Sequence, residues 1–531
     1  MSYSEAWLSW LEDPAAIRGL LVEVQVYDVV AAADTTLYLS TMGYVTTTAD
    51  VAYNPILNNS IQLTESLDIQ GNSAGLSYGD LEINNATGEF DAWLDHTKYI
   101  WVNKSINIYH GDPRWVCANL TAVRSTFQLI FSGVIADVDS RSRTSINIKL
   151  RDKLERLNAP ITENVLGATG TWASGQNNME SIRPLIFGEV FNIEPLLTDP
   201  ATFTFMFSDG TAELLIEIRD NGVPLYTHNG TSVVLNADVP NTVNLTTGTF
   251  VLSRPLAGTC TVSVQGVKNS INLSTGALVT NSYVNNVANL VALIVTQYGK
   301  ASTKFTAADL DLVNLSAFEA ANQQKVGIVI SDRENVLNVC QQLASSIGAQ
   351  LYINRFGKLQ LLKIGVPTSD TSVDITDNDI LHFSLSVVSK LEVAGATSIG
   401  YCKNWLTQSG LVTGIPDNHK NIFAAEWPNP KISSDATTIS RYTLDSLPVQ
   451  KDTLLISESQ ASAEAARLTT YYKIPRTVYK FTGTSRLLSL KLGQSVTLTH
   501  SRFNLSAGKS GQITRLSPDW LNGTIEVEVL I

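Results

Sequence analysis

The sequence predicts a mainly β protein with α+β insertions, folded as several domains. Short runs that alternate apolar and polar residues recur along most of the chain, and clusters of turn residues separate them. This pattern is typical of strands that are half-buried in sheets. Helical periodicity is limited to a few short segments. The length of 531 residues exceeds what one ordinary core holds and suits about three or four domains.

The composition indicates a folded protein with an unusually uncharged surface. The hydrophobic fraction is 44% and the charged fraction only 16%, while Ser, Thr and Asn are plentiful. Such a surface packs against neighbours with little charge desolvation, which favours a part of an assembled particle. The net charge of -12 and the lack of a Lys/Arg cluster argue against tight nucleic-acid binding. An acidic wall would still let DNA pass.

The first predicted domain, residues 1–165, is built from strands. Its β-rich runs lie at 20–27, 78–85, 105–109, 127–135 and 145–150. We expect the last two to form a hairpin joined by the polar segment 137–144. A short helix should follow, because Leu150, Leu154 and Leu157 share one helical face before Pro160.

The second predicted domain, residues 166–282, is a small β-module that follows a linker rich in Gly, Thr, Ser and Asn at 167–178. Its strands are expected at 249–252 and 259–264. The Asp-Asn-Gly sequence at 220–222 and the Asn-Gly sequence at 229–230 predict tight turns.

The third predicted domain, residues 283–390, combines helices with a hairpin. Its first helix carries Val284, Val287, Val291, Ile294 and Tyr298 on one stripe, and Gly299 follows as the C-cap. The second helix should begin at a capping box formed by Ser331 and Glu334 and end at Gly348. Strands at 350–354 and 358–362 then form the hairpin. The second helix is expected to bury one stripe of residues: Val336, Val339, Cys340, Leu343 and Ile347.

The fourth predicted domain, residues 391–531, returns to strands, with one helix at 461–472 that ends before Pro475. The strand candidates lie at 479–482, 488–490, 496–498, 513–516 and 525–531.

Motifs of metal, nucleotide and hydrolase sites are incomplete, so we expect no catalytic, cofactor-binding or metal-binding residues. The segment 506–510 has the end of a phosphate-binding loop but lacks its first glycine, and predicts an exposed turn. The acidic pairs at 137–139 and 377–379 lack the rest of a calcium loop and predict solvated turns. No spacing for a metal joins the four cysteines (Cys117, Cys260, Cys340, Cys402), expected as buried or half-buried thiols, or the six histidines (His96, His110, His228, His382, His419, His500).

One group keeps an enzymatic alternative open. Glu82, Glu89 and Asp91 lie near Trp93 and Trp101 in the sequence, and carboxylates beside aromatic rings are what a glycosidase cleft uses. The same residues also suit a turn and a sheet face. A cell-wall hydrolase is therefore one alternative. A receptor-binding adhesin is another, although no fibrous repeat is present.

Several strings, in their order along the chain, resemble the tail hub proteins of siphovirus-like bacteriophages. They are TESL at 64–67, SYGDLEI at 77–83, FSGVIAD at 131–137, IKLRDKL at 148–154, DRENV at 332–336, FGKL at 356–359, YCKNW at 401–405, FAAEW at 423–427, LGQSV at 492–496 and GKSG at 508–511.

The resemblance implies a non-enzymatic structural protein of the virion tail tip or baseplate. It implies a homotrimeric ring in which two tube-like β-barrel domains per subunit, residues 1–165 and 391–531, match the six-fold tail tube. The two middle domains would decorate this hub. The implied partners are the distal tail protein, the tape-measure protein and tip or fibre proteins, and DNA would leave through the lumen without specific binding. Because the sequence lacks a signal peptide and a long apolar run, we expect synthesis in the host cytoplasm and no membrane anchor.

Overall fold

A computed structural model describes the chain except residues 1–2, 14, 47–49, 60, 62, 70–73, 114–123, 168–178, 229–232, 236–239, 366–372, 445–446 and 449. The fold is mainly β, as the sequence predicts. It divides into two compact units. Unit 1 comprises Met1–Glu155, Tyr352–Leu391 and Pro475–Ile531, and unit 2 comprises Arg156–Leu351 and Glu392–Ile474.

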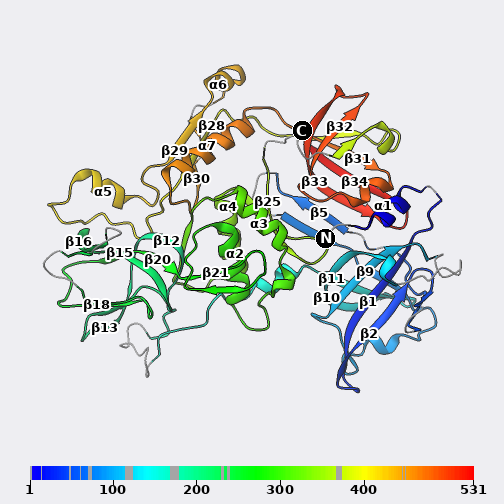
Figure 1. The fold of residues 1–531 in the computed structure, drawn as a ribbon, viewed down its shortest axis with the longest axis horizontal. Coiled ribbons are helices and arrows are strands. Elements are labelled where there is room, and N and C mark those ends of the chain that lie inside the picture. Colours follow the sequence, from blue (N-terminus) through cyan, green and yellow to red (C-terminus); the bar gives the residue numbers. More distant parts are fainter. Residues whose placement is uncertain are drawn as a thin grey trace. The chain divides into compact units, whose positions relative to one another are not determined.

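These units follow other boundaries than the four predicted domains. The first and the last segments of the chain both belong to unit 1. Strand β5 (Leu63–Leu67) of the first segment pairs there with strand β33 (Leu505–Asp519) of the last. In Figure 1 the blue β5 accordingly lies beside the red β33. Residues 392–474, expected to belong to the last β-domain, lie in unit 2. The linker predicted at 167–178 falls almost entirely outside the described residues, as do the turn predicted at 229–230 and Cys117.

The first sheet of unit 1 has seven strands in the order β2-β1-β9-β10-β11-β7, with β8 also on β1. Its main strands are antiparallel, and those near the centre bury alternate side chains. The strands are β1 (Gly19–Asp28), β2 (Ala33–Ser40), β7 (Leu81–Asn84), β8 (Tyr99–Ile100), β9 (Ser105–Gly111), β10 (Gln128–Ser142) and β11 (Ser145–Arg151); a short pair, β3 (Tyr44–Val45) and β4 (Ala52–Tyr53), accompanies them.

A short segment, residues 54–58, closes this sheet on itself. The Asn54 amide donates to the carbonyl of Tyr38 in β2 at 3.0 Å, and the Asn58 amide donates to the carbonyl of Glu82 in β7 at 2.9 Å. Two further bonds run the other way, from the amides of Ser40 and Asn84. The end of β2 and the edge strand β7 are therefore hydrogen-bonded by the chain itself, which leaves less open edge for further pairing.

The second sheet of unit 1 has eight strands in the order β26-β32-β33-β34-β31-β27, and β5 joins it through β33 and carries β6. The segment between β26 and β27 includes a one-turn 3-10 helix, η7 (Asp377–Asp379), and hydrogen bonds link it to the segment at the end of β31. The additional strands are β6 (Ala74–Tyr78), β26 (Val373–Ile375), β27 (Ser386–Lys390), β31 (Thr477–Gly483), β32 (Ser495–His500) and β34 (Thr524–Leu530).

The main strands of the two sheets follow the same cyclic order. In the first sheet the neighbours run β1-β9-β10-β11, and in the second they run β32-β33-β34-β31. Numbered by their order along the chain, the four strands of the first sheet lie side by side as 1-2-3-4, and those of the second sheet as 2-3-4-1. Both sheets therefore have the same circular order of neighbours and differ only in which pair of strands is left unpaired. Each sheet also has one bulged strand of 15 residues, β10 and β33 respectively. Residues of both sheets form one continuous hydrophobic core.

Unit 2 contains a β-sandwich formed by residues 185–267 together with the later strand β23. A six-stranded sheet, β17-β16-β15-β20-β12-β23, and a four-stranded sheet, β13-β14-β19-β18, share one core. These strands are β12 (Leu185–Ile193), β13 (Leu196–Asp199), β14 (Thr204–Met206), β15 (Ala212–Asp220), β16 (Val223–His228), β17 (Val233–Leu235), β18 (Pro240–Asn244), β19 (Thr249–Leu252), β20 (Cys260–Val267) and β23 (Gly327–Ile330). The predicted turn between β15 and β16 is confirmed, since Asn221 and Gly222 both have positive φ.

Helices and small sheets complete unit 2. Helix α2 (Val287–Gln297) contacts α3 (Leu312–Ala321) and α4 (Val336–Ser346), and helix α7 (Glu458–Tyr472) packs on the sheet β29-β28-β30. The remaining elements are β21 (Asn269–Ile271), β22 (Leu278–Thr280), β28 (Ala396–Gly400), β29 (Lys431–Ser434), β30 (Gln450–Asp452), α5 (Asp417–Ala424) and α6 (Ala436–Tyr442). The predicted helices near 284–298, 331–347 and 461–472 are confirmed, as are the buried stripe of α4 and the positive φ of Gly348. The hairpin that follows α4 is also confirmed: β24 (Ala349–Ile353) and β25 (Leu359–Lys363).

Several local predictions were wrong. Ser331 and Glu334 form no capping box: the Glu334 carbonyl accepts from the Ile161 amide, and α4 begins only after Asn335. The segment 488–490 is not a strand, because its first two residues belong to a 3-10 helix, η8 (Ser485–Ser489). The polar segment 137–144 mostly extends β10. The helix predicted from Leu150 shrinks to the 3-10 helix η4 (Lys153–Leu157), since Leu150 pairs within β11.

No helix of the described residues is long and apolar enough to span a lipid bilayer.

Candidate functional site

The residues of the glycosidase alternative hold a surface turn together. The Asn85 side-chain amide donates to the Asp91 carboxylate at 2.7 Å, and that of Asn58 donates to Glu82 at 3.2 Å. The Trp101 indole donates to the Trp93 carbonyl at 2.9 Å and is buried in the core of unit 1. These contacts are ones that hold a folded turn together, and the pocket described below is lined by other residues.

The other incomplete motifs also have structural roles. The segment 506–510 is not an exposed turn, as predicted, but part of β33, where Ser510 pairs with Thr497. The acids at 137–139 lie in β10, and the Asp139 carboxylate pairs with Lys149 at 2.6 Å. Cys260 and Cys340 are buried and Cys402 is half-buried. Within the part of the chain that the structure describes, no three His, Cys, Asp or Glu residues are grouped as metal ligands.

A buried ion pair joins the β24–β25 hairpin to the second sheet of unit 1. Arg355 lies at the tip of the β24–β25 hairpin, and its guanidinium contacts the Glu65 carboxylate of β5 at 2.9 Å. The two side chains are only 2% and 1% exposed. The Arg355 guanidinium also donates to the Leu490 carbonyl at 2.5 Å. Its own carbonyl accepts from the Ser132 amide of β10 at 2.8 Å, so this one residue bonds to strands of both sheets.

Two charged side chains are tolerated in this buried position only because they are paired with each other. Removing one partner would leave the other charge buried without compensation, which typically costs about 3–5 kcal/mol. The nearby Tyr3 side chain is partly buried, and burial of its hydroxyl raises the pKa of that group. We therefore assign the pair of Arg355 and Glu65 to holding the two sheets in a fixed arrangement within unit 1.

An aromatic cage around His110 forms a second junction. His110 lies in β9, and the rings of Trp7, Trp10 and Trp520 have centroids 5.8, 5.0 and 5.4 Å from its own. Trp7 and Trp10 belong to helix α1 (Glu5–Leu11), and Trp520 follows β33 of the second sheet. Burial lowers the pKa of His110 to about 3, so the imidazole is neutral at physiological pH.

Sequence reasoning missed helix α1 and this cage. The signal was present: Tyr3, Trp7 and Leu11 recur at four-residue spacing, and Ser4 stands at the N-cap. The Ser4 hydroxyl indeed accepts from the Trp7 amide at 3.3 Å. The helix was overlooked because seven residues are too few for a clear periodicity.

Strand β27 is an exposed edge of the second sheet. All five of its residues are exposed, including Val387 at 40% and Val388 at 51%. Just before it, Phe383 is 94% exposed and adopts a φ of 61°. A phenylalanine with positive φ stores backbone strain, and such strain is common at functional contacts. An apolar, strained and solvent-facing edge is what a neighbouring subunit would cover.

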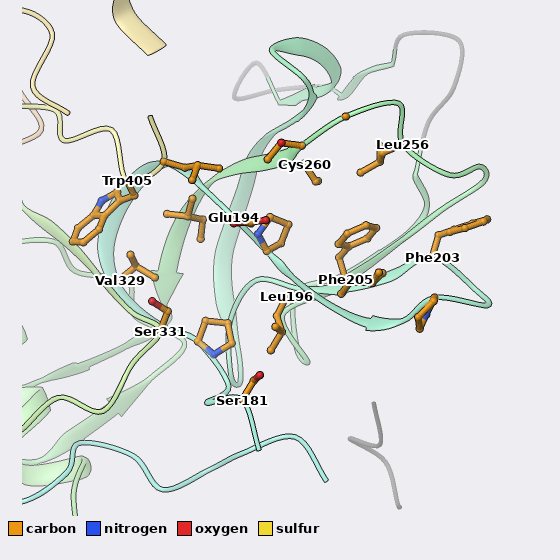
Figure 2. A pocket seen from close by; sticks show the side chains of 18 of the residues that line it. Ser181, Glu194, Leu196, Phe203, Phe205, Leu256, Cys260, Val329, Ser331 and Trp405 are labelled. Atoms are coloured by element: carbon orange, nitrogen blue, oxygen red, sulfur yellow. The ribbon is translucent and has the colours of Figure 1, made fainter. Parts of the chain in front are cut away.

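A large pocket, with a volume of about 950 Å³, lies in the sandwich of unit 2. It opens between the ends of the two sheets. Figure 2 shows Trp405 on one side and Phe203 on the other, with Glu194, Leu196 and Phe205 between them. Its lining is mostly apolar, and four of the lining residues are prolines: Pro184, Pro195, Pro200 and Pro255.

A buried amide network holds one wall of this pocket. The side-chain amide of Asn192 donates to the side-chain oxygen of Asn404 at 2.5 Å and to the Leu406 carbonyl at 2.7 Å. Asn404 in turn donates to the Phe423 carbonyl at 2.9 Å. Both asparagines are 5% exposed. These bonds fix the segment that carries Trp405 against the end of β12, so the wall is preformed.

No protein-family model and no curated protein matches the chain. Among solved structures, it is similar to the 43 kDa tail protein of prophage MuSo2 from Shewanella oneidensis, with 10% identity over 96% of this chain and 98% of that chain and a TM-score of 0.38. It is also similar to a chain of the virion of a native gene transfer agent particle, with 11% identity over 71% of this chain and 91% of that chain and a TM-score of 0.41. A tail protein from Neisseria meningitidis MC58 shares 9% identity over 96% of both chains, with a TM-score of 0.35. These TM-scores are below 0.5, so the function is argued from the residues of this chain itself.

Proposed function

We propose that the chain is a structural subunit of a bacteriophage tail, and that three copies form the hub ring of the tail tip or baseplate. The observation that carries this proposal is the internal likeness of unit 1. The main antiparallel strands of its two sheets have the same cyclic order, and the sheets share one core. Three copies would bring six similar sheets around one axis, which is how a trimer can adapt to a six-fold tube.

The sequence resemblance is the second support. Most of its strings fall on unit 1, at 64–67, 77–83, 131–137, 148–154, 356–359, 492–496 and 508–511. They lie on the strands of the two sheets or directly beside them, and these sheets are the part of the chain that would form the wall of the ring. A tail role by assembly, without catalysis, agrees with the structural contacts made by the residues of the glycosidase alternative.

The ring contact is assigned to the exposed edge of the second sheet. Phe383 and the valines of β27 would be covered by a second copy, which relieves the exposure of a flat apolar edge. A stable contact of this kind buries more than about 1,000 Å² in total. The net charge of -12 suits a lumen through which DNA passes without binding. The distal tail protein, the tape-measure protein and tip or fibre proteins remain the proposed partners.

Light scattering after size-exclusion chromatography tests the ring, and immunogold labelling of intact phage tests the location. We expect the wild-type chain to be a trimer, and gold to mark the tail tip. The double variant Phe383→Asp, Val388→Asp should be a folded monomer. The matched control is Val313→Asp on α3 of unit 2, which is 82% exposed and should leave the trimer intact. A wild-type monomer at high concentration, together with tail tips that bind no gold, would refute the proposal.

A further inference from the structure

We infer that the ring contact joins two different sheet edges: strand β27 of one copy pairs with the first part of strand β2, residues 33–37, of the next copy. This inference rests on the proposed function, because it requires a ring of three copies. It deepens that proposal by naming the surface that receives β27.

The symmetry of a ring requires two different surfaces on each copy. In a closed ring of three, each copy contacts the next one head to tail, so β27 cannot meet β27 of its neighbour. Each copy contributes one first sheet and one second sheet, and the two kinds of sheet therefore alternate around the axis of the proposed ring. The surface that receives β27 then belongs to the first sheet of the neighbouring copy.

The first sheet has one stretch of edge that its own chain leaves open. The sheet ends at β2 and β7, and the segment 54–58 bonds to both of these strands. On β2 this segment reaches Tyr38 and Ser40 and goes no further. Residues 33–37 have backbone hydrogen bonds to β1 on one side, and no described residue bonds to their backbone on the other side.

The alternation of backbone groups along β2 shows which of them are open. Tyr38 and Ser40 bond to the segment 54–58, away from β1, and every second residue of an antiparallel strand faces the same way. The amides and carbonyls of Asp34 and Thr36 therefore also face away from β1. The ladder between β1 and β2 has no bulge, and β2 contains no proline or lysine. An edge without these protecting features is one that another strand can join.

Strand β27 offers the matching open edge. It pairs with β31 on one side, and on the other side no described residue bonds to its backbone. All five of its residues are exposed, and the ladder with β31 shifts register once, between Val387 and Ser389. A strand that joins such an edge gains backbone hydrogen bonds along its length.

Apolar side chains flank both edges. The turn that leads into β2 exposes Val30 at 84% and Val29 at 39%, and the turn before β27 exposes Phe383 at 94%. The Asp28 carboxylate accepts from the amide of Val30 and from the next amide, both at 2.9 Å, which holds the turn before β2 in one shape. A contact between the two edges removes apolar surface from water on both copies.

The charges on the two strands do not oppose the pairing. Lys390 is the one charged residue of β27, and Asp34 is the one charged residue of β2. Asp34 is already paired with Lys104 of its own copy, so covering the edge leaves no unpaired acid there. Like charges on opposite strands, which destabilise a sheet, are therefore absent from this contact.

The variant Thr36→Pro tests the role of β2 in the full-length chain. Proline removes an amide that faces away from β1, and an edge strand tolerates this change, so the monomer should stay folded. Light scattering should show that the concentration needed for half-maximal trimer formation rises at least about ten-fold. The matched control Thr36→Val keeps the amide and should assemble like the wild type.

Mixing two defective variants tests whether these two edges meet. Thr36→Pro keeps an intact β27, and the double variant Phe383→Asp, Val388→Asp keeps an intact β2. Each variant alone should be a monomer, because neither can close a ring. An equimolar mixture should contain a one-to-one dimer, in which the intact β27 of the first variant pairs with the intact β2 of the second.

Disulfide cross-linking gives a measurement that does not depend on the folding of the proline variant. Val388→Cys is combined in turn with Asp34→Cys, Thr35→Cys and Thr36→Cys, which covers adjacent registers. Under mild oxidation at least one of these pairs should yield covalent trimers on a non-reducing gel, since paired strands bring the two thiols within bonding distance. The control is Val388→Cys with Glu82→Cys on β7, which should not cross-link.

The outcomes separate the inference from the proposed ring. A wild-type chain that stays a monomer contradicts the ring itself. A wild-type trimer overturns the inference alone in any of three cases: Thr36→Pro assembles as well as Thr36→Val, the two folded variants form no dimer when mixed at high concentration, or none of the three cysteine pairs yields covalent trimers.

Discussion

The two sheets of unit 1 share a cyclic strand order but differ in how their open edges are treated. In the first sheet, residues 54–58 bond to both edges, and Leu57 within that segment is only 7% exposed. In the second sheet, β27 stays at the edge with all of its residues exposed, and Phe383 beside it is 94% exposed. One sheet is bonded at both edges by its own chain, and the other leaves β27 exposed, which is where we propose the subunit contact. Two sheets with the same strand order can therefore differ in whether their edges are free for a contact, and a single segment such as residues 54–58 makes this difference.

The largest effect is expected from the buried ion pair of Arg355 and Glu65, because Arg355 bonds to strands of both sheets. We expect Arg355→Met to lower the free energy of unfolding by about 3–5 kcal/mol, because the buried Glu65 carboxylate loses its partner. Chemical denaturation of the variant measures this loss.

The control for that experiment removes both charges. Arg355→Met combined with Glu65→Leu should recover most of the lost stability, since no unpaired charge stays in the core. A double variant as unstable as the single one would mean that the hydrogen bonds of Arg355 to the backbone, and not its charge pairing, hold the sheets.

This pair also marks the limit of prediction from sequence. Helix α4 could be predicted because its buried stripe repeats within a few residues, and the turn at Asn221 and Gly222 because both residues tolerate positive φ. The contact of Arg355 with Glu65 joins distant segments, and nothing local in either segment signals it. The division into units was missed for the same reason: β5 pairs with β33 near the other end of the chain.

The pocket of unit 2 could not be predicted either. Its walls come from four separate stretches of sequence, around 181–206, 255–260, 329–331 and 405–406. Each stretch alone reads as an ordinary strand or loop with prolines. The positive φ of Phe203 in the pocket wall is a property of the folded chain that no local sequence signal announces.

The closing segment of the first sheet should contribute much more stability than its exposed counterpart. We expect Leu57→Ala to destabilise the chain by about 2–4 kcal/mol, because a buried leucine leaves a cavity. Phe383→Ala, measured at concentrations where the chain is monomeric, should change stability by less than about 0.5 kcal/mol. Thermal or urea unfolding of both variants compares the two segments directly, and equal losses would contradict the difference drawn here.

The cage around His110 predicts a dependence of stability on pH. The pKa of His110 is lowered from 6.5 to about 3 in the folded chain, so only the unfolded chain takes up this proton between those values. The free energy of unfolding should therefore fall as the pH decreases from about 6.5, by up to about 1.4 kcal/mol per pH unit from this group. Urea titrations between pH 7 and 5 measure the slope. His110→Gln should show a shallower slope, and identical slopes would show that the imidazole does take up a proton when folded.

The smallest expected effect concerns the strain at Phe383. Glycine adopts a φ of 61° without the steric clash that a phenylalanine side chain causes. The Phe383 ring is almost fully exposed, so its removal costs the monomer little buried apolar surface. Phe383→Gly should thus stabilise the monomer by about 0.5–1 kcal/mol while weakening trimer formation. Val388→Gly is the matched control, because this position in β27 has no positive φ and glycine there should destabilise by about 0.5–1 kcal/mol. If Phe383→Gly left the trimer unchanged, the strained ring would have no part in the subunit contact, and the open edge of the second sheet would need another explanation.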